Sequence, residues 1–143
     1  MPASTNKIPQ GFSSFAHDEG HIGLNGPYYF KEQDKGGFTY GFLPDHRHGN
    51  PNNVIHGAAL LSFVDTAFGH LVVANTQRYC ATISLTTEFI TAEQVDKWVN
   101  AEVYLKKLTG SLAFVGAEVF CENKMLLSAT AIFKLFTERK PSS

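Results

Sequence analysis

The sequence predicts an α+β fold in which an antiparallel sheet packs against one long apolar helix. The helix prediction comes from a run between Ile55 and Ala74 that is apolar on most sides. The sheet prediction comes from a period of two in hydrophobicity, which is repeated in four later segments and is typical of strands with one face on a core. A sheet large enough to wrap the helix would bury the apolar faces of both.

The expected elements follow in order along the chain. Residues 1–26 are rich in Gly, Ser, Pro and Asn, which favours a loop or a short helix. Aromatic residues flanked by Gly indicate two short strands at 26–33 and 37–43, and a polar loop follows at 45–53. The four strands with period two are expected at 79–89, 99–105, 113–121 and 127–135.

The ends of the long helix carry cap signals. Asn52 and Asn53 precede it as expected N-caps, and Asn75 is expected to close it. Because the helix is apolar on most sides, one face of a sheet would leave part of it uncovered. We therefore expect some of the helix to contact another subunit.

Composition and charge exclude several classes of protein. The chain has 143 residues, 43% apolar and 17% charged, which suits one compact domain. The net charge is −1 and Lys and Arg are scattered, so no basic stripe for nucleic acid is expected. The only long apolar stretch contains Asp65 and His70, which argues against a membrane span. With Cys80 and Cys121 read as reduced thiols and no secretory signal, we expect a cytoplasmic protein.

Asp65 is unusual because it lies near the middle of this apolar helix. An unpaired buried carboxylate is costly, so it must be paired, neutralised or placed in a wet cleft. A carboxylate in a cleft is a candidate general base or nucleophile. The alternative is a partly exposed acid on the solvated side of the helix.

His56 and Gly57 lie at the expected start of the helix. Free backbone N–H groups there, aided by the helix dipole, can stabilise a developing oxyanion, and Gly57 lets a substrate approach the backbone closely. A plain helix start is the alternative. Gly57 and Asp65 are eight residues apart, which is about 12 Å along a helix. They can flank one carbonyl only if two antiparallel copies meet, which predicts a two-fold dimer.

The stretch NVIHGAALLSFVDTAFG at 53–69 resembles the signature of the hotdog-fold acyl-CoA thioesterases of the phenylacetate-degradation (PaaI) type. In that family an Asn-x5-His-Gly-(Gly or Ala) segment is followed by an Asp eight residues after the first Gly. The matching positions here are Asn50, His56, Gly57, Ala58 and Asp65.

The resemblance implies a hotdog fold, a curved antiparallel sheet wrapped around the central helix. It covers residues 27–137, which we expect to form the thioesterase domain. Residues 1–26 would then be an N-terminal loop or short helical segment, and 138–143 a C-terminal tail.

The resemblance also implies roles for single residues. The Gly57 N–H would polarise the thioester carbonyl, and Asn50 would hold or orient it. Asp65 of the facing subunit would activate water or attack directly. A Ser or Thr at the start of the following strand positions the water in this family, and Thr82 is the best match, with Ser84 as the alternative.

Contacts to coenzyme A are implied less directly. The family's Gly-(Arg or Lys)-(Ser or Thr) element appears here as Thr109-Gly110-Ser111, without the basic residue. Lys106, Lys107 or Arg78 would have to supply the charge for the phosphates. The residues expected to contact substrate or coenzyme A are His56, Lys106, Gly110 and Ser111.

The expected function is hydrolysis of a small, medium-chain or aryl-acyl thioester of coenzyme A. No metal and no other cofactor is expected. The expected partners are the acyl-CoA substrate and a second copy of the chain, in a homodimer with its sites at the interface that pairs further into a homotetramer.

Three alternatives remain open at this point. The chain could be a non-catalytic acyl-CoA-binding hotdog module, although a pure binder does not need the acid at Asp65. It could be a hotdog dehydratase or hydratase, but His70 lies five residues after Asp65 and so off its helix face. His46 and His48 form an H-x-H pair that could bind metal, but no further ligand has a convincing spacing.

Overall fold

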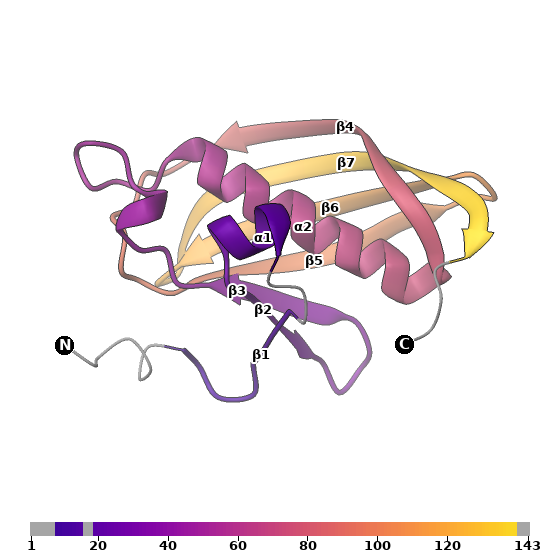
Figure 1. Cartoon of the computed structure of the whole chain (residues 1–143), viewed down its shortest axis with the longest axis horizontal. Helices are drawn as coiled ribbons and strands as arrows, with labels where there is room; N and C mark the ends of the chain where they lie inside the picture. The colour runs from indigo at the N-terminus through magenta and orange to yellow at the C-terminus, as the bar shows by residue number, and fades with distance from the viewer. Residues whose placement is uncertain (1–7, 16–18, 140–143) are drawn as a thin grey trace.

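The computed structural model describes residues 8–15 and 19–139, which form one sheet wrapped around one long helix (Figure 1). The long helix α2 (Gly57–Thr76) lies along a seven-stranded antiparallel sheet. A short helix, α1 (Gly20–Asn25), lies against α2, where His21 Nε2 is 2.5 Å from Ser62 Oγ. The layers are therefore sheet, α2 and α1.

The strand that follows α2 in the chain lies at one edge of the sheet. Its strand order is β1-β2-β3-β5-β6-β7-β4, with antiparallel neighbours throughout. Although β4 follows α2 directly in the chain, it pairs with β7 and forms one edge of the sheet. The strands are β1 (Ser13–Ser14), β2 (Tyr28–Glu32), β3 (Phe38–Phe42), β4 (Arg78–Phe89), β5 (Val99–Leu108), β6 (Leu112–Cys121) and β7 (Lys124–Arg139).

The six predicted strands and the short N-terminal helix are confirmed. Strands β4 to β7 each extend beyond their predicted limits, because turn residues adopt the pairing of the strands beside them. The two-residue strand β1 was not predicted, since SS carries no strand signal. The loop at 45–53 contains one turn of 3₁₀ helix, His46–His48.

The start of the long helix differs from the prediction. The expected start at Ile55 and the expected caps Asn52 and Asn53 are wrong, because the helix begins at Gly57 with His56 as its N-cap. The Ala58 N–H donates to His56 Nδ1 over 3.1 Å. An imidazole nitrogen therefore accepts the N-terminal N–H bond that the side-chain oxygen of an Asn cap was expected to accept.

The end of the helix also lies later than expected. Asn75 does not close the helix, because its side-chain NH₂ donates to the Leu71 carbonyl over 2.8 Å within the helix. The helix continues to Thr76, and Gln77 caps it with a left-handed φ of 56° and an N–H bond to the Val73 carbonyl.

One face of α2 fills the concave side of the sheet. Burying each large side chain of this face stabilises the fold by about 1.5–3 kcal/mol. Length and apolar composition alone would allow α2 to cross a membrane, but its buried face identifies it as the core helix. The buried residues of α2 are Leu60, Phe63, Val64, Ala67, Phe68, Leu71 and Val72.

The β4 edge leaves large apolar side chains exposed. Ile83 and Phe89 are each 56% exposed, and Ile90, just after the strand, is 52% exposed. An open edge with apolar side chains is a ready surface for another chain. This surface agrees with the expected subunit contact, which stays a prediction.

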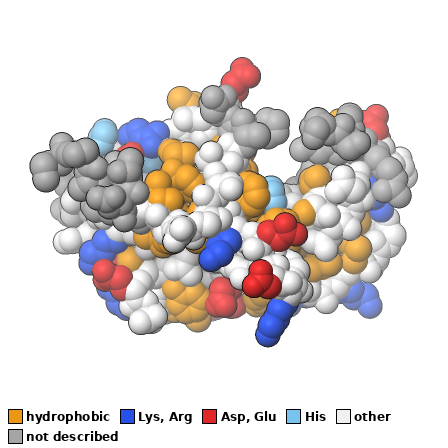
Figure 2. All heavy atoms as spheres, turned by 90° about the horizontal axis from the view of Figure 1, so that it is seen from below, with side chains coloured by type: hydrophobic (Ala, Val, Ile, Leu, Met, Phe, Trp, Pro, Cys, Tyr) orange, Lys and Arg blue, Asp and Glu red, His pale blue; other side chains and the backbone are white. Residues whose placement is uncertain are grey.

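The face seen in Figure 2 has acidic and basic side chains interspersed among hydrophobic ones. Mixed signs of this kind do not build the single-sign field that attracts nucleic acid. This face therefore agrees with the scattered charges seen in the sequence.

Candidate active site

Asp65 lies on the half-buried face of α2, opposite the apolar core. The Thr82 hydroxyl, on β4, donates a hydrogen bond to Asp65 Oδ1 over 2.7 Å. The carboxylate is thus hydrogen-bonded and partly exposed, which avoids the cost of burying an isolated charge. The structure brings together these two residues, which the sequence placed in one site.

Ser84, the alternative to Thr82, points elsewhere. The register between β4 and β7 shifts between Thr82 and Ser84. Ser84 then lines a hollow of about 260 Å³ together with Thr130 and Lys106. Thr130 alternates with the buried Ala131, so this hollow is on the sheet face away from α2. The geometry favours Thr82 over Ser84 as the partner of Asp65.

One backbone N–H group in the first turn of α2 remains available as a hydrogen-bond donor. The Ala58 N–H is taken by the His56 side chain, and the N–H groups of Ala59 and Leu60 donate to the His56 carbonyl over 2.9 and 3.4 Å. Among the residues described, no acceptor is recorded for the Gly57 N–H. This donor lies at the positive end of the helix dipole and is suited to an oxyanion.

His56 adds a second donor beside Gly57. Because Nδ1 of His56 accepts the Ala58 N–H, the proton of the neutral imidazole lies on Nε2. His56 is exposed, so this Nε2–H can reach a ligand. A hollow of about 360 Å³ next to Gly57 is lined by Phe89 and Ile90. The helix start therefore offers donors next to an open, partly apolar space.

Asn50 is held by its own loop. Its side-chain oxygen accepts the N–H groups of Asn52 and Val54 over 2.9 and 3.0 Å. Because the oxygen is engaged twice, only the side-chain NH₂ can serve a ligand. A carbonyl oxygen requires a donor of this kind, so the geometry is compatible with the expected role of Asn50.

Gly57 and Asp65 lie on one continuous helix, as expected. Their separation of eight residues is about 12 Å along the axis, so one chain does not place both on the same carbonyl. The exposed β4 edge and the half-buried face of α2 lie on the same side as Asp65 and Thr82. A second copy placed there would complete the site.

The residues expected at coenzyme A are dispersed. His56 lies at the start of α2, Lys106 lies on the outer sheet face, and Gly110 and Ser111 form the turn between β5 and β6. This turn lies at the C-terminal end of α2, because Arg78 donates to the Gly110 carbonyl over 2.9 Å. The structure does not bring these four residues together within one chain.

Arg78 was one candidate for the coenzyme A phosphates. Its guanidinium donates to three backbone carbonyls, those of Phe136, Gly110 and Leu135, over 2.7, 2.9 and 3.4 Å. These contacts tie β4 to the end of β7 and to the turn before β6. Arg78 therefore acts as a structural crosslink, and Lys106 and Lys107 remain as the exposed candidates.

The H-x-H pair at 46–48 is used for structure. His48 is buried, its Nδ1 accepts the Asp45 N–H over 2.9 Å, and its Nε2 is 2.5 Å from the Asn25 carbonyl oxygen. With both ring nitrogens engaged, His48 cannot pair with His46 as a metal ligand.

Glu93 is a buried acid that holds the loop before α2 in place. No pattern in the sequence indicated this role. The Glu93 carbonyl accepts the Ile55 N–H over 2.8 Å. Lys124 and Lys97 lie 2.5 and 3.2 Å from its carboxylate, and the Gln94 N–H donates to it over 2.9 Å. These contacts, that of Lys124 first, lower the pKa of Glu93 to about 2.

The same carboxylate belongs to the one group of candidate metal ligands found among the described residues. Glu93, Cys121 and Glu122 place their ligand atoms within 4.8 Å of one another. The two lysines already balance the acidic charge, since Lys97 also lies 3.5 Å from Glu122. The arrangement is an ion-pair network that needs no cation.

We expect Glu93→Gln to lower the free energy of unfolding at pH 7 by about 1–3 kcal/mol, because it removes hydrogen bonds to a charged group. The folded pKa of Glu93 is depressed from 4.5 to about 2, so its contribution is complete above pH 4.5. It is lost as the pH falls from 4.5 toward 2. Urea unfolding of wild type and variant between pH 7 and pH 3 should show the two stabilities converging. A gap that stays constant over this range would contradict the assignment.

The comparisons with known proteins agree on one family. The family model described as thioesterase superfamily matches residues 52–128, more than half of the chain. A curated Pseudomonas aeruginosa protein named "Putative esterase PA0474" is 22% identical over 130 residues, covering 90% of this chain and 97% of its own. Among solved structures, the BH2602 protein from Bacillus halodurans with CoA is 18% identical, with a TM-score of 0.69 over 77% of this chain and 74% of that chain. The E. coli PaaI protein from the phenylacetic acid degradation operon is 13% identical, with a TM-score of 0.68 over 73% of this chain and 75% of that chain.

At these identities the solved structures establish the fold alone. The architecture is the hotdog fold, an antiparallel sheet wrapped around one long helix. Both the predicted fold class and the resemblance to hotdog thioesterases of the PaaI type are confirmed.

Proposed function

The chain belongs to the thioesterase superfamily, and from this premise we propose that it hydrolyses a small, medium-chain or aryl-acyl thioester of coenzyme A. The products are the free acid and coenzyme A. The observation that carries the proposal is the Thr82–Asp65 pair, with 2.7 Å between its oxygens, on the open face of the central helix. A partly exposed carboxylate that is oriented by a hydroxyl donor can activate a water molecule or attack directly.

The helix start supplies the electrophilic half of the mechanism. The Gly57 N–H donates to the thioester oxygen, where negative charge develops in the transition state. The Nε2–H of His56 and the side-chain NH₂ of Asn50 are the further donors for substrate. Both are fixed in orientation because their other polar atoms are engaged by backbone N–H groups.

Asp65 supplies the nucleophilic half. It removes a proton from the attacking water, or it attacks the carbonyl carbon itself and water then hydrolyses the acyl-enzyme anhydride. In both routes the thiolate of coenzyme A leaves, and Thr82 orients the carboxylate. The residues place no requirement for a metal or another cofactor on either route.

The two halves meet across a homodimer. Antiparallel α2 helices place Asp65 of one subunit next to Gly57 of the other, which gives two equivalent sites per dimer. The exposed apolar side chains of the β4 edge, Ile83 among them, supply the contact surface. Two dimers pair further into a homotetramer, and the protein is cytoplasmic and binds neither nucleic acid nor membrane.

Coenzyme A extends from this site toward basic side chains. Lys106, with the Gly110–Ser111 turn, contacts the phosphates, and the polar turn supplies N–H and hydroxyl donors. The solved structure of BH2602 contains CoA, and that of a hypothetical thioesterase protein from Streptococcus pneumoniae contains coenzyme A, which supports binding of the same ligand here.

A non-catalytic acyl-CoA-binding module is the second candidate. It would use the donors at Gly57 and Asn50 but would have no use for the Thr82–Asp65 pair. Release of free thiol from a panel of acyl-CoA esters separates the two. Thiol release by wild type supports the hydrolase, whereas tight binding of the esters without release would leave only the binding module.

Thr82→Val is expected to lower kcat about tenfold, because Asp65 loses the donor that orients it, while Thr82→Ser retains the hydroxyl and most of the activity. The side chain of Thr82 is exposed, so neither change should lower the melting temperature by more than a few degrees. Thiol release by the two variants, measured side by side, checks this. Equal activity of the Val and Ser variants would contradict the role of the hydroxyl.

A further inference from the structure

A mostly apolar groove of about 510 Å³ runs along the open face of α2 and begins next to Asp65. Its floor is formed by residues of α2, from Thr66 to Val73 and Ala74, and one wall is formed by Tyr79 and Cys80 of β4. Thr66 follows Asp65 in the chain, and Cys80 precedes Thr82 by two residues and so shares its strand face. The groove is therefore continuous with the candidate active site.

We propose that this groove holds the acyl group and that Phe15 and Ile22, from the N-terminal segment, form an outer wall whose contacts favour long over short acyl chains. The inference rests on the proposed hydrolase function. Both residues line the groove, and both precede residues 52–128, which match the thioesterase family model. This wall is thus contributed by a part of the chain outside the family match.

Phe15 is fixed by the sheet and by a cluster of rings. Its N–H donates to the Tyr28 carbonyl over 3.0 Å. Its ring centroid lies 5.0 Å from the ring of His70, 5.6 Å from that of Phe30 and 6.3 Å from that of Tyr40. His70 is in turn hydrogen-bonded to the Tyr40 hydroxyl over 2.7 Å. The inner part of the wall is therefore built on the core.

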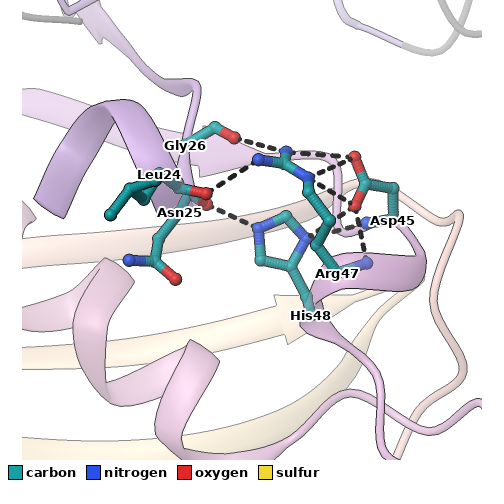
Figure 3. Close-up of polar contacts among 6 residues, drawn as sticks. All are labelled: Leu24, Asn25, Gly26, Asp45, Arg47 and His48. Atoms are coloured by element: carbon teal, nitrogen blue, oxygen red, sulfur yellow. Dashed lines mark hydrogen bonds and ion pairs between the residues drawn. The ribbon is translucent and has the colours of Figure 1, made fainter. Parts of the chain in front are cut away.

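Ile22 is fixed because α1 is anchored at its C-terminal end. Figure 3 shows the Arg47 guanidinium reaching the carbonyls of Leu24 and Gly26, at 2.8 and 2.7 Å, while Asp45 holds Arg47 from the other side. The neighbouring His48 contacts the Asn25 carbonyl over 2.5 Å. Consecutive carbonyls at the end of α1 are thus bound by the loop that leads to the start of α2.

A second contact fixes α1 to the helix below it. The Tyr28 hydroxyl donates to Ser62 Oγ over 3.0 Å, and Ser62 Oγ lies 2.5 Å from His21 Nε2. Asn25 Nδ2, a donor, lies 3.3 Å from the same nitrogen, so His21 Nε2 is an acceptor and the Ser62 hydroxyl donates to it. Ile22, the next residue, is held above the groove by this bond.

The dimensions of the groove indicate its ligand. From Thr66 to Val73 it extends over seven residues of α2, which is about 10 Å. Its volume lies in the range of pockets that enclose a small ligand. An acetyl group would leave most of it empty, whereas a medium straight chain or an arylalkyl group would fill it. We therefore assign medium-chain and arylalkyl acyl groups as the preferred class.

Gly69 allows the groove to be filled without disturbing the fold. A Cβ at this position meets no heavy atom within 4 Å. Replacing a glycine inside a helix stabilises it by about 0.5–1 kcal/mol. Within one chain Gly69→Leu should therefore fold and occupy the groove with its side chain, whereas Gly69→Ala occupies little of it. Because Gly69 lies one turn after Asp65, the molecular mass in solution verifies that each variant keeps the dimer.

The test measures kcat/KM for butyryl-CoA and octanoyl-CoA by thiol release. Gly69→Leu is expected to lower the octanoyl-to-butyryl ratio by about tenfold or more, since each methylene lost from a pocket is worth about tenfold or more. Gly69→Ala should change it much less. Ile22→Ala should lower the same ratio about three- to tenfold. The matched control is Leu24→Ala, because Leu24 is on the same short helix, is 74% exposed and does not line the groove.

The experiment gives different results if the groove assignment is wrong and if the hydrolase proposal is wrong. A ratio that is unchanged in both Gly69→Leu and Ile22→Ala, in proteins that still hydrolyse butyryl-CoA, would overturn the groove assignment alone. If wild type releases no thiol from any ester, the hydrolase proposal fails, and calorimetric binding then decides the groove. Tighter binding of octanoyl-CoA than of coenzyme A, weakened by Gly69→Leu, supports the assignment, and equal binding of both ligands overturns it.

Discussion

Replacing Asp65 by asparagine is expected to lower kcat for acyl-CoA hydrolysis by about two to four orders of magnitude, the usual worth of a positioned general base. The amide is close in size to the carboxylate and its oxygen can still accept the Thr82 hydroxyl, which lies 2.7 Å from Asp65 in the wild type. It cannot take a proton from water or act as a nucleophile. Because Asp65 is half-buried and outside the apolar core, the variant should keep its fold.

The measurement is free-thiol release from acyl-CoA esters, together with the melting temperature and molecular mass in solution. Asp34→Asn is the matched control, since Asp34 is an exposed turn residue and the chemical change is identical. Full activity of a folded Asp65→Asn protein would remove Asp65 from the mechanism. Loss of activity in the control as well would show that the assay reports stability and not chemistry.

Gly57→Pro is expected to lower kcat by about 10²–10³-fold, the effect of removing one oxyanion donor. Proline has no N–H, yet it is favoured at the first position of a helix, where that N–H has no partner within the helix. The preceding residue, His56, has φ −65° and ψ 135°, which is the backbone region that a residue before proline prefers. The substitution should thus delete a single hydrogen-bond donor from an intact helix start.

Gly57→Ala separates the effect of losing the N–H donor from the effect of crowding at Phe89. A Cβ at this position lies 3.1 Å from the Phe89 ring, so alanine and proline both press on Phe89. Alanine keeps the N–H, and its kcat should stay within about tenfold of wild type, given that Phe89 is exposed and can shift. If the two variants lose activity equally, the loss comes from crowding at Phe89 and not from the missing donor.

Much of the fold could be predicted from the sequence because its signals are local. The strands β5 to β7 alternate apolar and polar residues over much of their length, and the antiparallel register places buried residues such as Val103, Ala117 and Ala129 on the same face. The pairing of Asp65 with Thr82 could be predicted only through the resemblance to a family. The ends of α2 were predicted wrongly, because the capping rules favour Asn over the imidazole of His56.

The contacts that were missed join segments far apart in the chain. Lys124 reaches Glu93 across the end of the sheet, and Arg47 reaches back to the carbonyls after α1. Neither contact has a sequence spacing that would predict it, because the two partners come close only in the completed fold. The contacts of Arg78 escaped prediction for the same reason, because its carbonyl partners lie on β7 and in the turn before β6.

In the proposed mechanism each site takes Gly57 from one subunit and Asp65 from the other, and mixing two inactive variants tests this sharing of the site. Asp65→Asn and Gly57→Pro proteins with different affinity tags are unfolded together, refolded and assayed, and the two tags verify that mixed dimers form. Half of the dimers should be mixed, and each mixed dimer has one site with both wild-type residues, so about a quarter of wild-type activity should return. Mixed dimers that form but stay inactive would contradict a site shared between subunits.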